Sequence, residues 1–176
     1  MIEEQVILVD KEDNELGLMN KQEAHIKGVL HRAFSVFIFN SKNELLLQQR
    51  AHDKYHSAGL WTNSCCSHPR KNEKVLDAAN RRLFEEMGMK SVLKKGFDFI
   101  YKAKMINNLF EHELDHVFLG FTDDEPTINP LEVASYKYMS MEKIEEDISC
   151  NPSLYTEWFK ICFNEVKLRL NKTEDA

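Results

Sequence analysis

Two short groups of side chains in this sequence could do chemistry. Residues 64–69 read Ser-Cys-Cys-Ser-His-Pro, which places two thiols and an imidazole close together in a predicted loop. Residues 111–115 read Glu-His-Glu-Leu-Asp, and in a strand Glu111, Glu113 and Asp115 would point to one side. Carboxylates this close repel one another unless something neutralises them. These residue types indicate a metal site and proton transfer between acid–base groups.

A helix with paired arginines and paired glutamates is predicted between these two groups, over residues 73–87, with Gly88 as its cap. The face predicted to pack against the core holds Val75, Leu76, Ala79, Leu83 and Met87. Glu86 falls about 20° from Val75 on this face, where a carboxylate is costly unless it is paired or bound to metal. Two interpretations stay open: an ion pair with Arg82 four residues earlier, or a divalent-cation ligand with Arg82 near a phosphate.

The remaining pattern predicts the elements that must position these groups. Strands are predicted at residues 6–9, 32–40, 45–50, 97–105, 111–121 and 134–139, and a final helix from 151 to about 170. Residues 20–27 are predicted to be a short helix or a loop, and a turn at 41–44 makes a hairpin of its two strands. Phe97, Phe99, Tyr101 and Ala103 alternate onto one face of their strand. Residues 51–72 form a long loop, which favours a functional segment because it carries the thiols and His68.

The order of the elements predicts the fold class. Strands followed by a helix, further strands and a last helix predict an α/β (α+β) fold, with a mixed sheet packed between helices as a sandwich. A length of 176 residues fits one domain over 1–176, with its core over about 21–170.

Composition limits the partners. The formal charge of −6 gives no support to a nucleic-acid partner, so an anionic ligand would need a local group of cations. The N-terminus has no long apolar run and no stretch could span a membrane, so we expect no signal peptide and no membrane partner. Four cysteines do not make a disulfide scaffold, and reduced thiols in the cytoplasm are the simpler expectation.

The predicted helix resembles the Nudix box, G-x5-E-x7-R-E-U-x-E-E-x-G-U, in which U is aliphatic. Counted from Ser67, the positions in register are Glu73, Arg81, Leu83, Glu85, Glu86, Gly88 and Met89. Two positions depart from the box: Ser67 stands for its glycine and Arg82 for its glutamate. The second departure removes an acid that hydrolases of this family place on the helix. The resemblance therefore implies a Nudix-like α/β/α sandwich used for something other than diphosphate hydrolysis.

Residues 61–69, with the sequence Trp-Thr-Asn-Ser-Cys-Cys-Ser-His-Pro, resemble the loop of type I isopentenyl-diphosphate isomerases, a branch of the Nudix superfamily. This resemblance implies one metal site made of His25, His31, His68, Glu111 and Glu113. Three imidazoles and two carboxylates suit Mn²⁺ or Zn²⁺. It also implies that Glu86 helps to hold Mg²⁺ against a diphosphate. The sequence alone does not select these three of the seven histidines, and His52 and His56 receive no role.

The same resemblance implies isomerisation of isopentenyl diphosphate to dimethylallyl diphosphate through a tertiary carbocation. Glu113, assisted by Tyr101, would add a proton and Cys66 would remove one. A thiol pKa of ~8.5 is lowered beside cations, so Cys66 is expected to exchange protons near neutral pH. Cys65 is expected to be a buried, small apolar residue.

The substrate implied by the resemblance is a small allylic or homoallylic diphosphate. Its phosphate-contacting positions match Lys21, Arg50, Lys54 and Arg82 in this sequence. Trp158 would shield the carbocation through its ring face, whereas Trp61 is expected in the core. We expect a monomer or a weak homodimer.

Two other functions stay open at this point. One is a Nudix hydrolase acting on a nucleoside diphosphate derivative, against which Arg82 in place of the box glutamate argues. The other is a non-catalytic metal or thiol sensor that uses the pair of Cys65 and Cys66. Phosphate release would indicate the hydrolase, and tight metal binding without turnover would indicate the sensor.

Overall fold

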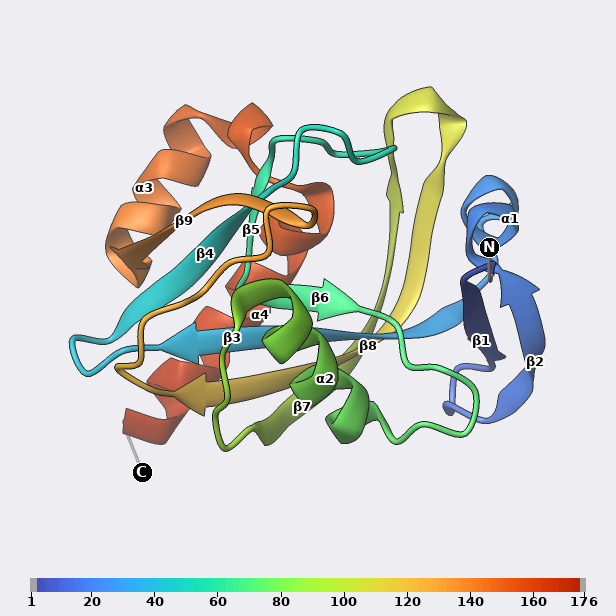
Figure 1. Ribbon diagram of the computed structural model, residues 1–176, viewed down its shortest axis with the longest axis horizontal. Coiled ribbons are helices and arrows are strands. Elements are labelled where there is room, and N and C mark those ends of the chain that lie inside the picture. Colours follow the sequence, from blue (N-terminus) through green and yellow to red (C-terminus); the bar gives the residue numbers. More distant parts are fainter. Residues whose placement is uncertain (1–2, 175–176) are drawn as a thin grey trace.

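The strand β3 (His31–Phe39) is the centre of the fold, because it is paired on both sides and buried on both faces. The computed structural model describes residues 3–174, and within them a nine-stranded mixed sheet lies between helices (Figure 1). The strands around β3 are β1 (Gln5–Val9), β2 (Glu15–Asn20), β4 (Glu44–Arg50), β5 (Trp61–Thr62), β6 (Cys65–Ser67), β7 (Lys94–Lys104), β8 (Phe110–Phe121) and β9 (Val133–Ser140). The helices are α1 (Lys21–Lys27), α2 (Val75–Met87), α3 (Met141–Cys150) and α4 (Glu157–Glu174), with short 3₁₀ turns at Ile106–Asn108 and Pro152–Leu154.

Alternation along β3 creates two hydrophobic layers. Phe34, Val36 and Ile38 pack with α2 on one face of the sheet. Phe37 and Phe39 pack with α4 on the other face, beside the aromatic residues of that helix. A strand that is apolar on both sides is typical of a sheet covered by helices on both faces. The predicted α/β sandwich with a mixed sheet is confirmed.

Helix α2 begins at Val75, two residues later than predicted, and ends where Gly88 adopts a left-handed conformation with φ 63°. A Cβ at Gly88 would lie 2.6 Å from the carbonyl oxygen of Thr127, which explains the glycine at this position. The predicted buried face is wrong at Leu76, whose side chain is exposed. The first turn packs through the small Ala78 and Ala79 instead, so the buried face turns away from Leu76.

The segment predicted as a long loop inserts two short strands into the sheet. The expected hairpin closes only at its turn, where Phe39 pairs with Leu45, and β3 and β4 then separate. Strands β5 and β6 fill the opening, with β5 on β4 and β6 on β3. The buried Ser64 links β3 and β4. Its Oγ accepts from Ile38 N of β3 at 2.9 Å and donates to the Leu46 carbonyl of β4 at 2.7 Å. Polar side chains thus replace the missing backbone pairing and hold residues 65–68 in place.

Three elements lie outside the predicted set or differ in extent. Strand β2 was not predicted because it is an exposed edge strand without a buried alternating face. Helix α3 occupies a segment for which no element was predicted, and Ser140 caps it by accepting from the backbone N–H of Lys143. The last helix begins at Glu157 rather than near 151, and it continues past 170. Within residues 3–174, none of the helices combines the length and apolar character needed to cross a bilayer.

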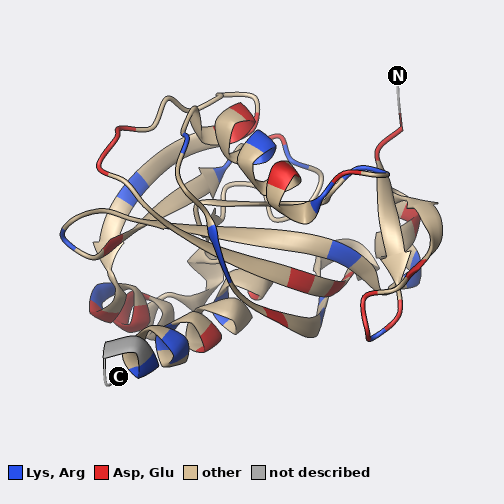
Figure 2. Cartoon of the chain, turned by 90° about the horizontal axis from the view of Figure 1, so that it is seen from below, with Lys and Arg blue, Asp and Glu red and all other residues tan. Residues whose placement is uncertain are grey.

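Charged residues of both signs are interspersed along the chain (Figure 2). On α4, for example, Lys160 pairs with Glu157 at 2.7 Å. The formal net charge is −6. An anionic ligand would therefore depend on a local group of cations rather than on the charge of the whole molecule.

Candidate active site

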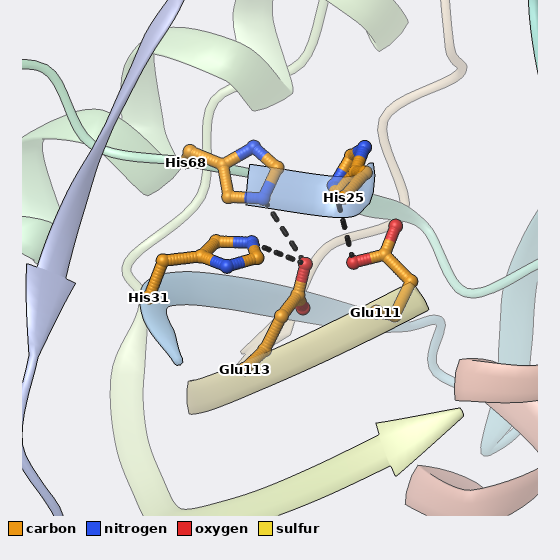
Figure 3. A group of neighbouring side chains, drawn as sticks. All are labelled: His25, His31, His68, Glu111 and Glu113. Carbon is orange, nitrogen blue, oxygen red and sulfur yellow. Dashed lines mark hydrogen bonds and ion pairs between the residues drawn. The ribbon is translucent and has the colours of Figure 1, made fainter. Parts of the chain in front are cut away.

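Five metal-binding side chains converge beside the sheet (Figure 3). They are His25, His31, His68, Glu111 and Glu113, and one ligand atom of each lies within 4.8 Å of those of the others. His25 Nε2 is 3.5 Å from Glu111 Oε2. The Nε2 atoms of His31 and His68 lie 3.4 Å and 3.0 Å from Glu113 Oε1. The structure thus brings together the complete set that the resemblance implied for one metal site.

Strand register explains this convergence. Strands β3 and β8 are parallel, with His31 directly opposite Glu113. Glu111 lies two residues earlier on β8 and therefore points to the same side. Strand β6 pairs with β3 and ends one residue before His68, while α1 packs on β8 and buries His25.

Several buried atoms of this cluster have no hydrogen-bond partner among the described residues. Those that face the other ligands are His25 Nε2, His31 Nε2 and Glu111 Oε2. Buried polar atoms are nearly always satisfied, so this set fits a cation that would accept their lone pairs. His31 Nδ1 lies 2.9 Å from the carbonyl oxygen of Val29, and the hydrogen it must donate there leaves Nε2 free as a ligand.

The protonation states around this cluster also fit a cation site. Burial, together with His68 and His31, lowers the pKa of His25 to about 3, so its imidazole is neutral as a ligand must be. Burial and the neighbouring Glu113 raise the pKa of Glu111 well above its usual range. Burial would also raise the pKa of Glu113, but hydrogen bonds from Glu111, His31 and His68 hold it well below. The two carboxyl groups therefore share one negative charge in the metal-free protein.

Tyr101 completes the environment of Glu113 from the neighbouring strand. It lies opposite Glu113 in the antiparallel pairing of β7 with β8, and its hydroxyl donates to Glu113 Oε2 at 2.7 Å. Burial and the negative charge of Glu113 raise the pKa of Tyr101 well above its usual range. The phenol therefore remains a protonated donor, in contact with the carboxylate.

Cys66 and Glu113 border the same cavity, whose volume is about 830 Å³. Cys66 lies on β6 opposite Ser35 of β3, and its side chain is half-buried. Among the other predicted site residues, those at the cavity wall are Lys21, Arg50, Lys54, His68, Arg82, Glu86, Tyr101, Glu111 and Trp158. His25 and His31 lie behind this wall, in the metal cluster.

The expectation of a lowered pKa for Cys66 is wrong. Burial raises the pKa of the Cys66 thiol to about 12, and the nearby Arg50 offsets only part of this effect. The thiol is therefore protonated near neutral pH in the unliganded protein. Cys65 is completely buried, as expected, but its thiol also donates to Glu86 Oε2 at 2.7 Å.

The raised pKa predicts an unusual alkylation profile. With iodoacetamide, the rate at Cys66 should increase about tenfold per pH unit from pH 7 to 10, because only the thiolate reacts. A thiol with an ordinary pKa of about 8.5 would reach a plateau near pH 9.5. Peptide mass spectrometry measures both the rate at Cys66 and that at the exposed Cys150, which serves as the internal reference. A plateau for Cys66 below pH 10 would contradict the effect of burial.

Two arginines at the cavity wall also have unpaired donors. The Nε atoms of Arg50 and Arg82 are buried and have no hydrogen-bond partner among the described residues. Lys54 forms an ion pair with Glu132, and Lys21 contacts Glu4 at 3.1 Å. The four predicted cations therefore border one space, and two of them keep a free N–H group.

Glu86 forms an ion pair with Arg82, which was one of the two interpretations left open for this residue. Its Oε1 accepts from Arg82 Nη2 at 3.0 Å, and its Oε2 accepts from the Cys65 thiol. Arg82 also contacts Glu85 at 2.8 Å and Glu132 at 3.5 Å. Glu86 nevertheless lies at the cavity wall, beside the arginine that would face a phosphate.

The two tryptophans occupy different environments. Trp158 of α4 is buried at the cavity wall, and the guanidinium carbon of Arg50 lies 5.2 Å from its ring centre. Trp61 packs against the core, as expected, but is only half-buried, and the ammonium of Lys137 lies 4.1 Å from its ring centre. The guanidinium of Arg50 therefore already makes a cation–π contact with the ring of Trp158.

Two consecutive residues of the loop after Lys54 were missed. Tyr55 Oη forms a short hydrogen bond with His25 Nδ1, and His56 Nε2 lies 3.8 Å from Glu111 Oε1. His56 is buried, although it was left without a role. The sequence signal that could have identified them is their position: two aromatic residues with polar ring groups directly follow Lys54, a predicted phosphate contact.

Comparisons with known proteins agree with this geometry. A family model of the NUDIX domain matches residues 29–159. An "Isopentenyl-diphosphate Delta-isomerase" of Pectobacterium atrosepticum is 52% identical over 162 residues, which cover 92% of this chain and 90% of that protein. An "Isopentenyl-diphosphate Delta-isomerase 2" of Photorhabdus laumondii is 54% identical over 163 residues, which cover 93% and 92%.

Solved structures share the fold at lower identity. The crystal structure of DR0079 from Deinococcus radiodurans has a TM-score of 0.74 and 16% identity, covering 90% of this chain and 96% of that chain. The structure of a MutT protein from Methanosarcina mazei has a TM-score of 0.65 and 21% identity, covering 81% and 96%. At these identities the likeness concerns the fold alone.

Proposed function

Because this chain belongs to the isopentenyl-diphosphate Delta-isomerases of the NUDIX family, we propose that Glu113, Tyr101 and Cys66 transfer the protons of that isomerisation. The enzyme converts isopentenyl diphosphate to dimethylallyl diphosphate. The observation that carries the assignment is that Glu113 and Cys66, from different strands, border one cavity. The acid and the base must reach the same short hydrocarbon chain, and a shared cavity supports this.

The diphosphate binds at the cationic part of the cavity. Lys21, Arg50, Lys54 and Arg82 contact its oxygens, and the free Nε–H groups of the two arginines support this role. Glu86 would hold Mg²⁺ beside the diphosphate, and its carboxylate would have to release the contact with Arg82 to do so. Anchoring the charged end positions a five-carbon chain that has few contacts of its own.

Proton transfer takes place at the other end of the substrate. A proton is added to the terminal alkene carbon, one is lost from the carbon two positions away, and the intermediate is a tertiary carbocation. We assign addition to Glu113 with Tyr101 and removal to Cys66. In the metal-free protein the thiol of Cys66 carries a proton and Glu113 does not. That is the state of the pair after a forward turnover, and the reverse reaction starts from it.

Two further groups assist the proposed chemistry. Trp158 offers its ring face at the cavity wall, an interaction worth about 2 kcal/mol in a site that excludes water. Mn²⁺ or Zn²⁺ would be held by the five clustered side chains, and when bound it supplies positive charge that makes a proton on Glu113 more labile.

The free thiols of the described chain support a cytoplasmic location.

An exchange experiment tests the function. Purified protein, Mg²⁺ and either Zn²⁺ or Mn²⁺ are incubated with isopentenyl diphosphate in D₂O and followed by NMR. We expect dimethylallyl diphosphate with deuterium in a methyl group and no phosphate release. Recovery of unlabelled, unconverted substrate would refute the function, and release of phosphate would favour the hydrolase alternative.

A further inference from the structure

The loop between β4 and β5 reaches over the metal cluster and contacts two of its members. Tyr55 Oη is hydrogen-bonded to His25 Nδ1, and the two rings are stacked with centres 6.1 Å apart. His56 follows directly, and its ring meets that of His25 edge-on with centres 5.5 Å apart. Neither residue belongs to the five-ligand group, so both contact that group from outside.

The contact of Tyr55 determines which nitrogen of His25 can bind an ion. Nε2 of His25 points to Glu111 and lacks a hydrogen-bond partner among the described residues, so it is the ligand atom. A lone pair on Nε2 requires the hydrogen of the neutral ring to be on Nδ1. That N–H then donates to Tyr55 Oη. His31 achieves the same arrangement through the backbone carbonyl of Val29, whereas His25 depends on a side chain from another element.

His56 connects the cluster with the aromatic wall of the cavity. Its Nε2 lies 3.8 Å from Glu111 Oε1, and its ring meets that of Trp158 edge-on with centres 5.9 Å apart. Its backbone carbonyl accepts from Arg50 Nη2 at 3.2 Å. The ring of His56 therefore lies between a ligand carboxylate and the aromatic wall of the cavity.

We propose that Tyr55 and His56 are positioning residues of the metal centre. Tyr55 accepts the Nδ1–H of His25 and thereby aims Nε2 at the ion, while His56 restrains Glu111 and Trp158. The inference rests on the proposed metal site and assigns the two residues that hold its ligands. Outer hydrogen-bond partners of metal ligands commonly change metal affinity 10–100-fold.

The test measures Zn²⁺ affinity of the metal-free protein without substrate, by competition with a chromophoric chelator. Tyr55→Phe removes one hydroxyl and keeps the ring, and we expect 10–100-fold weaker binding of one Zn²⁺. Tyr138→Phe on β9 is the matched control, because it removes a hydroxyl away from the cavity, and its affinity should equal that of the wild type. At saturating Zn²⁺, Tyr55→Phe should regain the kcat of the wild type to within about threefold, since its defect lies in ion binding. His56→Phe, which keeps an aromatic ring beside Trp158, should weaken binding by about three- to tenfold.

The outcomes separate the inference from the proposed function. Equal Zn²⁺ affinity in Tyr55→Phe and wild type overturns the role of Tyr55, and so does a loss that Tyr138→Phe shares. Equal affinity in His56→Phe overturns the role of His56. If the wild type binds neither Zn²⁺ nor Mn²⁺ but still converts substrate, the five-residue metal site fails while the isomerase function stands.

Discussion

Glu113→Gln should reduce kcat by about 10⁴-fold or more, the largest effect expected from one substitution in this protein. Glu113 belongs both to the metal cluster and to the proposed proton-transfer group. Its carboxylate is contacted by His31 and His68 of the cluster and by Tyr101. An amide of the same size cannot act as a proton donor and is a poor metal ligand. General acid–base groups contribute about 10²–10⁴-fold, and the loss of a ligand adds to this. The measurement is dimethylallyl diphosphate formation, together with the metal content of the purified variant.

A matched control separates this effect from a general loss of charge. Glu146 is exposed on α3, away from the cavity, and Glu146→Gln should leave kcat unchanged. Circular dichroism should show the wild-type spectrum for both variants. Activity of Glu113→Gln within about tenfold of the wild type would contradict its assignment as the acid.

Cys66→Ala should lower kcat by about 10³–10⁴-fold, while the diphosphate still binds. The thiol borders the cavity, and the diphosphate is assigned to the four cations, so removal of the thiol should affect chemistry rather than anchoring. Calorimetry of isopentenyl diphosphate binding to the variant should give a dissociation constant close to the KM of the wild type. Hydrogen exchange into recovered substrate in D₂O should also be lost.

The matched control for this substitution is Cys150→Ala, which removes an exposed thiol far from the cavity. Its activity should equal that of the wild type. If Cys66→Ala retained kcat, another group would have to exchange the second proton. If it lost substrate binding to the same degree as kcat, the thiol would have a structural role in the cavity wall instead.

Part of this site follows from short-range rules that a sequence expresses directly. Alternation along a strand places Glu111 and Glu113 together, and the structure buries both on one side of β8. The pattern of β3 similarly predicts a strand between two layers. The Nudix box predicts α2, because helical periodicity and a glycine cap are local features. The buried face of this helix was nevertheless misassigned at Leu76, since packing against the sheet decides which side is covered.

The rest depends on pairings between distant segments. The register of β3 with β8 and β6 brings His31 and His68 to Glu113, and the packing of α1 on β8 brings His25 to Glu111. No local pattern distinguishes these histidines from His56, which lies as close to the cluster as its ligands do to one another. The direction of the Cys66 pKa shift was also missed, because burial is a property of the folded cavity.

The pairing of β3 with its neighbours has a consequence for redesign. Its residues His31 and Ser35 pair with Glu113 and Cys66, so the backbone positions of Glu113 and Cys66 are offset by four residues, about 13 Å along the strand, while both side chains border the cavity. Hydrogen bonding within the sheet fixes this backbone separation, and no side-chain substitution can lengthen it. Attempts to admit bulkier prenyl chains should therefore diversify the rim supplied by α4 and the loop before β5, and leave the three strands untouched.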